Sequence, residues 1–131
     1  MKSLAVAAVL TLGAGPALAT EWMYCGDRDS TVTVGLLLGA MDVLAVAGVI
    51  LSHEDKVWAS DVAYGPGEPV SVGQGFEDDT RLFVDLMDDG MVNVLAELRL
   101  MKAEEGDGPV IHAGTLRLPG RGAWAVSCDA P

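Results

Sequence analysis

The clearest pattern in the chain is the alternation of apolar and polar positions over residues 91–101. Every second residue from 92 to 100 is apolar, and the positions between them include Asn93, Glu97 and Arg99. Successive side chains of a β-strand point to opposite faces of its sheet, so this period of two predicts a strand with one buried face. That face needs an apolar cover. Because other segments alternate similarly, we predict that a second sheet or the far wall of a barrel supplies it.

Similar patterns along the chain predict eight or nine strands, separated by turns rich in glycine, proline and aspartate. Short strands at fairly even spacing are typical of an all-β domain, here a small antiparallel β-sandwich or barrel. The expected strands cover residues 21–26, 31–38, 43–51, 56–62, 70–76, 80–87, 91–101, 110–118 and 123–128. The loop over residues 64–69 contains two prolines and two glycines, which excludes an interior strand there.

Residues 35–51 are almost entirely apolar and also permit one helix of about 17 residues, which their alanines favour. Gly39 and Gly48 weaken a helix, and the β-branched residues favour a strand. Asp42 in the middle makes a membrane span costly by a few kcal/mol. We predict a turn that begins at Gly39, then a strand over 43–51 that is buried on both faces.

The amino terminus has the pattern of a cleaved export signal. Lys2 precedes the apolar run 4–12, and Ala-Leu-Ala at 17–19 provides a small-x-small cleavage site. A membrane anchor is the alternative, but the run is shorter than the ~20 residues that span a bilayer. We therefore predict a signal peptide over residues 1–19, a single domain over 20–131, a periplasmic or secreted location, and no stable membrane insertion after cleavage.

Cys25 and Cys128 lie near opposite ends of the predicted mature chain. Export favours a disulfide between them, and two buried thiols are the alternative. Closing a loop of about 100 residues stabilises a fold by roughly 4 to 5 kcal/mol.

The chain is acidic, with a net charge of −11, which becomes −12 if Lys2 is removed with the signal. Such a surface repels phosphate backbones, so we expect no nucleic-acid partner. A basic protein is a compatible partner. Solubility of an exported protein is the more ordinary explanation of the charge.

Two histidines are the first candidates for chemistry. His53, Glu54 and Asp55 are consecutive, but neighbours in a tight turn diverge and a zinc site needs preorganised ligands. We predict an exposed polar turn there and no metal site. His112 shares its strand face with Leu116, which predicts a partly buried, hydrogen-bonded structural histidine.

Neither Gly-x-Ser-x-Gly nor His-Glu-x-x-His occurs, and both cysteines are assigned to the disulfide. We predict no catalytic residue and no cofactor. A small hydrolase with an unrecognised site at His53 or His112 is kept as an alternative.

Acidic residues gather at 77–79 and 88–89, with Asp85 between them. The two groups lie at opposite ends of a strand of about eight residues, so roughly 25 Å separates them. No spacing of an EF-hand type is present. We therefore predict solvated turns and no calcium site, and the same holds for Asp27 and Asp29.

Trp22, Trp58 and Tyr64 lie near predicted turns, beside acidic residues. Exposed tryptophan and tyrosine are enriched in protein contacts, so Trp58 and Tyr64 are candidate surface contacts. Packing of the tryptophans in the core is the alternative that we favour.

A small, acidic, exported all-β domain with Cys25 in its first strand and Cys128 in its last resembles the periplasmic inhibitors of c-type lysozyme. The resemblance is one of architecture, since their Ser-Gly-x-x-Tyr motif is absent. It implies an inhibitor or binder of a basic secreted protein such as a lysozyme. The leading hypothesis is an exported, non-enzymatic protein that acts through surface binding.

Overall fold

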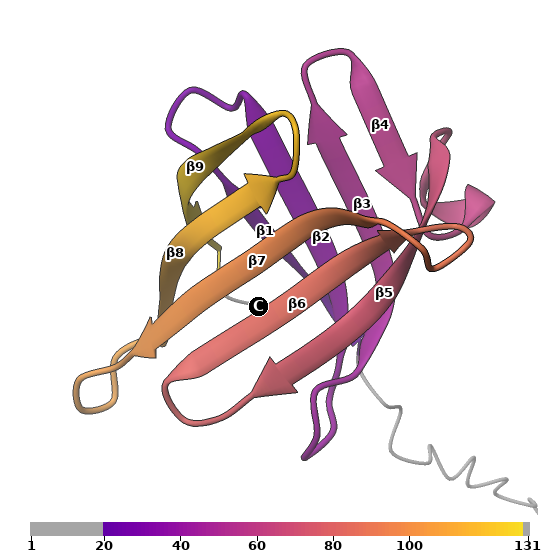
Figure 1. Cartoon of the computed structure of the whole chain (residues 1–131). Coiled ribbons are helices and arrows are strands. Elements are labelled where there is room, and N and C mark those ends of the chain that lie inside the picture. Colours follow the sequence, from indigo (N-terminus) through magenta and orange to yellow (C-terminus); the bar gives the residue numbers. More distant parts are fainter. Residues whose placement is uncertain (1–19, 130–131) are drawn as a thin grey trace, which may run out of the picture.

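The structure is a computed structural model that describes residues 20–129. Nine strands form one closed barrel in which neighbours along the chain are also neighbours in space, with β1 closing on β9 (Figure 1). The strands are β1 (Thr20–Gly26), β2 (Val32–Gly39), β3 (Val46–His53), β4 (Lys56–Ala59), β5 (Glu68–Glu77), β6 (Arg81–Asp88), β7 (Val94–Ala103), β8 (Ile111–Leu118) and β9 (Gly122–Cys128). The one helical element among these residues is the 3-10 turn η1 (Val62–Tyr64). Nowhere in this part of the chain does a helix reach the length and apolarity needed to cross a bilayer.

The prediction of an all-β fold is confirmed, and the arrangement is a barrel. The expectation of purely antiparallel pairing is wrong at one place, because β4 and β5 pair in parallel through Trp58 with Glu68 and Ala59 with Pro69. Residues 60–67 carry the chain back beside the last two residues of β4, so β5 begins parallel to it. Glu68 and Pro69 therefore belong to a strand, against the prediction of a loop. Proline is tolerated there because it lies at the beginning of the strand.

The ambiguous stretch 35–51 forms the end of β2, a loop and most of β3, so the helical alternative is excluded. The two strands pair antiparallel with an irregularity between Leu37 and Leu38. Full burial on both faces is not observed, because Val49 and Leu51 are buried whereas Ile50 and Ser52, which alternate with them, are only partly buried. One face of β3 lies on the outside of the barrel, where η1 is the element that packs against it.

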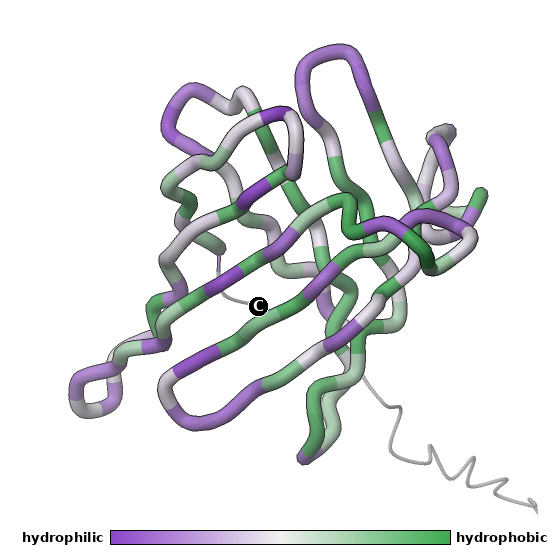
Figure 2. Tube along the Cα trace, in the orientation of Figure 1, coloured by the Kyte–Doolittle hydropathy of each residue, from purple (hydrophilic) through white to green (hydrophobic). Residues whose placement is uncertain are grey.

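Alternate residues of each strand point inward and fill the barrel. Figure 2 shows hydrophilic residues gathered at the turns and apolar residues along the strands. The fully buried side chains include Met23, Leu36, Leu51, Leu82, Leu86, Leu98, Leu100, Leu116 and Leu118. Burying each leucine-sized side chain contributes about 1.5 to 3 kcal/mol, so this interior is the main source of stability.

The pattern over residues 91–101 is confirmed for its second half only. Leu98 and Leu100 are buried, whereas Val92 is 77% exposed. The turn after β6 is longer than predicted, because the Asp88 carboxylate accepts hydrogen bonds from the amides of Val92 (2.8 Å) and Asn93 (3.1 Å). These bonds keep Val92 out of the ladder, and β7 begins at Val94.

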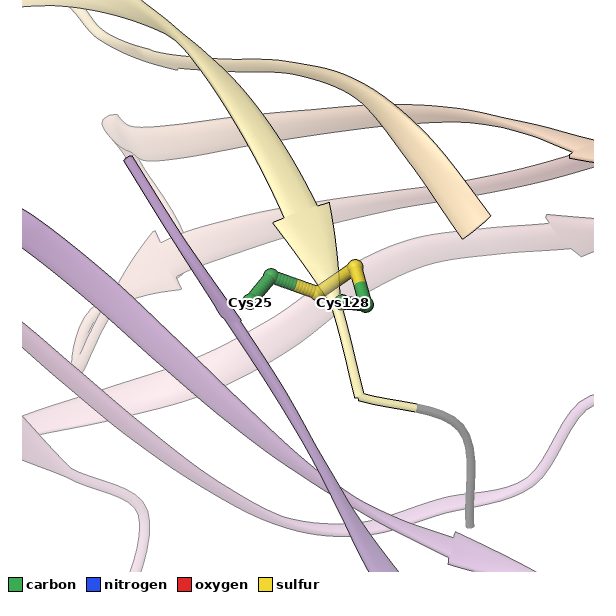
Figure 3. The surroundings of a disulfide bond; sticks show 2 residues. All are labelled: Cys25 and Cys128. Atoms are coloured by element: carbon green, nitrogen blue, oxygen red, sulfur yellow. A yellow bond between two sulfur atoms is a disulfide. The ribbon is translucent and has the colours of Figure 1, made fainter. Parts of the chain in front are cut away.

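The predicted disulfide joins Cys25 of β1 to Cys128 of β9 (Figure 3). Backbone pairing between the two strands is short, since only Cys25 with Cys128 and Gly26 with Ser127 are in register. The amide of Asp129 adds one hydrogen bond to the carbonyl of Tyr24 at 2.9 Å. A disulfide is compatible with an oxidising, extracytoplasmic compartment. The predicted signal peptide, residues 1–19, lies outside the described residues.

Candidate interaction surface

Three aromatic side chains gather on the outside of β1–β3. Met23 and Cys25 point into the barrel, so Trp22 and Tyr24, which alternate with them along β1, point outward. Tyr64 of η1 joins them from outside. The ring centroids of Trp22 and Tyr24 lie 5.8 Å apart with 15° between the planes, and Tyr64 meets Trp22 edge-on at 5.3 Å and 81°. We call Trp22, Tyr24 and Tyr64 the aromatic surface.

Two glycines make room for these rings. A Cβ at Gly35 would lie 2.8 Å from a ring carbon of Tyr24, and a Cβ at Gly48 would lie 2.7 Å from one of Tyr64. Gly35 is the register partner of Tyr24 on β2, so the ring extends across the neighbouring strand. Close approach of a ring to bare backbone is a reason for glycine within a strand.

Local hydrogen bonds fix the position of η1. The side chain of Asp61 caps it by accepting a hydrogen bond from the Ala63 amide at 2.8 Å. Ser60 ties the start of the loop to β3, because its hydroxyl accepts a hydrogen bond from the Val49 amide at 2.8 Å. The hydrogen bonds of Ser60 and Asp61, which precede Tyr64 in the chain, therefore fix the position of Tyr64 over β3.

The elements that carry the aromatic surface have acids close to them in the sequence and no basic residue of their own. The elements β1, β2, β3 and η1 contain no lysine or arginine. Glu21 precedes Trp22, Asp61 caps η1, and Asp129 donates its amide to the Tyr24 carbonyl. The negative net charge of the chain, together with exposed aromatic faces, favours a positively charged ligand.

The structure separates the residues that the sequence grouped. Trp58 is only 3% exposed, and its ring lies 5.4 Å from both the Lys56 ammonium and the Arg121 guanidinium. This burial removes Trp58 from the candidate contacts. Tyr64 and Trp22 are partly exposed and lie together. Tyr24, which the sequence analysis did not select, is the most exposed of the three at 49%. Tyr24 lies two residues after Trp22 in the same strand and therefore faces the same side, which is the sequence feature that could have identified it.

A second outward-facing aromatic group lies on β5–β7. Phe76 and Phe83 pack with ring centroids 6.1 Å apart. The Arg81 guanidinium carbon lies 5.3 Å from the Phe76 ring, and that of Arg99 lies 5.3 Å from the Phe83 ring. We call these four residues the arginine–phenylalanine surface.

Carboxylates hold both arginines of this surface in place. Arg81 forms a two-point contact with Asp78, the shorter bond being 2.7 Å from Nη2 to Oδ2. Arg99 Nη2 lies 2.7 Å from Asp85 Oδ1, a close ion contact whose geometry is not that of a well-aligned hydrogen bond. The Arg81 side chain, with the Thr80 amide, lowers the pKa of Asp78 to about 2. The cations are thus satisfied within the protein.

His53 does not lie in an exposed turn, so that prediction is wrong. It is the last residue of β3 and is buried, with its ring 4.9 Å from that of Trp124. Glu54 and Asp55 form the exposed two-residue turn that follows. Among the residues that the structure describes, the nearest carboxylate is Glu54, whose Oε1 lies 3.8 Å from His53 Nε2, and Nδ1 has no hydrogen-bond partner. This geometry offers no positioned acid–base pair.

His112 is buried, as predicted, and a backbone hydrogen bond with Val110 acts on its imidazole, although Nδ1 has no partner of good geometry among residues 20–129. Burial lowers the pKa of its imidazole, and the nearby Lys102 lowers that pKa further, while Glu77 acts in the opposite direction. Lys102 is itself paired with Glu77 at 3.1 Å. His112 is therefore held neutral as part of the barrel interior.

Within residues 20–129 no three metal-binding side chains are grouped. The acidic turns are occupied by their own hydrogen bonds. Asp78 accepts from the Thr80 amide at 3.0 Å, and Asp88 accepts from the Asn93 side chain at 2.8 Å. An open depression of about 480 Å³ lies beside η1, and Asp61 is the one titratable residue in its lining. A single carboxylate there does not make a catalytic pair.

Comparison with known proteins gives no match, since no family model, no curated protein and no solved structure is significantly similar to this chain.

Proposed function

We propose that this chain is an exported, non-enzymatic protein that binds a positively charged protein through its aromatic surface. The observation that carries the proposal is the combination of Trp22, Tyr24 and Tyr64 on an outer face whose strands contain no lysine or arginine. Tryptophan and tyrosine dominate the binding energy of protein contacts when they are held in fixed positions. The glycine positions under the rings and the capped η1 supply that fixed geometry.

The charge of the whole molecule supports a basic partner. A net charge of −11 attracts cationic proteins over a distance and raises their association rate at low salt. The expected export signal and the disulfide support an encounter outside the cytoplasm. A basic secreted protein such as a lysozyme satisfies both conditions.

A pull-down across salt concentrations tests this function. The oxidised chain 20–131 would be immobilised and exposed to hen-type lysozyme and to the same lysozyme after succinylation of its lysines. We expect the basic lysozyme to be retained and the succinylated lysozyme to be lost. Retention of the basic form should weaken as the salt concentration rises toward 1 M, where the Debye length falls to about 3 Å.

Two variants locate the contact. Tyr24→Ala should reduce retention about tenfold, because truncation of a central aromatic anchor typically costs more than 1 kcal/mol. Phe76→Ala, on the arginine–phenylalanine surface, is the matched control and should retain the partner. If neither lysozyme nor a panel of other basic exported proteins is retained at low salt, the proposal fails.

A further inference from the structure

We infer that the aromatic surface is an unfilled cation–π site that receives an arginine side chain of the partner. The inference rests on the proposed function and adds the chemical group that is recognised. It comes from a comparison among the aromatic rings of this one protein.

Three other rings already carry a cation from the same chain. Within residues 20–129, four of the five cation–ring contacts use arginine and one uses lysine. The contacts are Lys56 and Arg121 on Trp58, Arg81 on Phe76 and on Phe83, and Arg99 on Phe83, at 5.3 to 5.9 Å. The one remaining described ring outside the aromatic surface, that of Trp124, packs against His53 and the core.

The arginine–phenylalanine surface shows the complete arrangement. A guanidinium lies over an aromatic face, and a carboxylate contacts it from beside the ring, as in Arg81 with Asp78 and Arg99 with Asp85. A guanidinium suits this arrangement because it is planar, weakly hydrated and able to form several hydrogen bonds in its plane.

The aromatic surface has the rings of this arrangement, those of Trp22, Tyr24 and Tyr64. Glu21 and Asp61 are acids close to these rings in the sequence. No described cation lies over any of its rings. The missing part is the guanidinium, which a basic partner would bring.

The ring geometry favours a flat cation. Trp22 and Tyr24 are close to parallel, so their faces turn in nearly the same direction, while Tyr64 stands at 81° to Trp22 and forms a side wall. The planar guanidinium can lie on one ring and touch the edge of another. The ammonium of lysine is compact and strongly hydrated, so it gains less from the same rings.

Peptide titration tests the inference directly. Chain 20–131, oxidised, would be titrated with acetylated Gly-Arg-Gly amide, with its lysine analogue, and with its citrulline analogue, which keeps the shape but has no charge. Aromatic proton shifts would be followed by NMR. We expect saturable shifts on Trp22 and Tyr24 with the arginine peptide, weaker binding of the lysine peptide, and no saturable shift with citrulline.

Variants assign the shifts to the rings. Tyr24→Ala and Trp22→Ala should each weaken arginine-peptide binding by about 2-fold to 30-fold, the range expected when a cation–π contact of 0.5 to 2 kcal/mol is lost. Phe76→Ala should leave the affinity unchanged. Near-ultraviolet circular dichroism and the oxidised mass of each variant verify that the barrel is intact.

The outcomes separate the inference from the proposed function. Equal binding of arginine and citrulline peptides, or no saturable shift of the rings, overturns the inference even if lysozyme is retained through Tyr24. Arginine-peptide binding at the rings, without retention of any basic protein, supports the inference and overturns the proposed function.

Discussion

Both outer aromatic faces of this barrel carry paired rings, and they differ in whether a cation from the chain lies over those rings. On β5–β7, Phe76 and Phe83 are matched by Arg81 and Arg99, and each arginine is neutralised by an aspartate. On β1–β3 no cation within residues 20–129 lies over the rings. The rings of the first face thus have their cations from the same chain, and those of the second face do not.

Exposure alone does not separate the two faces. Phe76 is about as exposed as Tyr24, and both rings belong to outward-facing aromatic pairs. The distinction lies in the partners of each ring, which come from other strands. The difference indicates that an exposed aromatic residue becomes a candidate contact when the fold leaves its face unpaired.

The largest expected effect comes from removing the junction between β1 and β9. The double variant Cys25→Ser and Cys128→Ser should lose roughly 4 to 5 kcal/mol of unfolding free energy, because the bond closes a loop of more than 100 residues in the unfolded chain. Since β1 carries Trp22 and Tyr24, arginine-peptide binding should fall as well. Denaturant unfolding and peptide titration measure both, and a loss below 1 kcal/mol would contradict the expectation.

A substitution at Gly114 should damage the other side of the molecule. A Cβ at this position would overlap the carbonyl oxygen of Arg99, so Gly114→Ala must push β8 away from β7. We expect a loss of about 2 to 3 kcal/mol, measured by urea unfolding. Gly90→Ala is the control, because its Cβ would meet only a Val92 methyl at 3.7 Å. Equal stability of the two variants would refute the close approach.

Gly48→Ala should act on binding more than on stability. Its Cβ would lie 2.7 Å from the ring of Tyr64, which must move away. The expected cost is about 1 kcal/mol, because η1 is exposed and can shift. Arginine-peptide affinity should fall severalfold as the side wall is displaced. Unchanged Tyr64 proton shifts in the variant would argue against this packing.

Removing a cation from the complete face provides the converse test. Arg99→Gln eliminates the contacts with Asp85 and Phe83, and we expect a loss of about 1 kcal/mol, since both charged side chains are partly exposed. Binding of the arginine peptide to wild type and variant should be equal. Because Arg81 also lies 5.9 Å from the Phe83 ring, that ring keeps a cation in the variant. A new arginine-peptide site on Phe83 would therefore contradict the comparison.

Acidification should produce the smallest effect, through His112. Its pKa is lower in the folded state than in the unfolded chain, chiefly because it is buried. The unfolded state therefore takes up a proton more readily, and stability falls as pH decreases through the unfolded value near 6.5. Urea unfolding at pH 7.5 and pH 5.5 measures this loss. His112→Gln should show a smaller change, and an identical pH dependence would remove His112 as its cause.

Much of the fold follows from local sequence. A period of two identifies the strands, and the apolar set of β2, β6 and β8 is buried as that period predicts. The position of the two cysteines near the chain ends was sufficient to predict their bond. These inferences succeed because alternation and chain position are properties of the sequence itself.

Tertiary structure decided the features on which function depends. Trp58 and Trp22 both lie in short predicted strands near turns, yet Trp58 is buried beside Lys56 and Arg121 whereas Trp22 lies on the outer face. The parallel pairing of β4 with β5 and the placement of Tyr64 over Gly48 are likewise contacts between separate segments. The sequence determines which residues alternate. Only the closed barrel determines which face points outward and which rings meet a cation, because these depend on the packing of all nine strands at once.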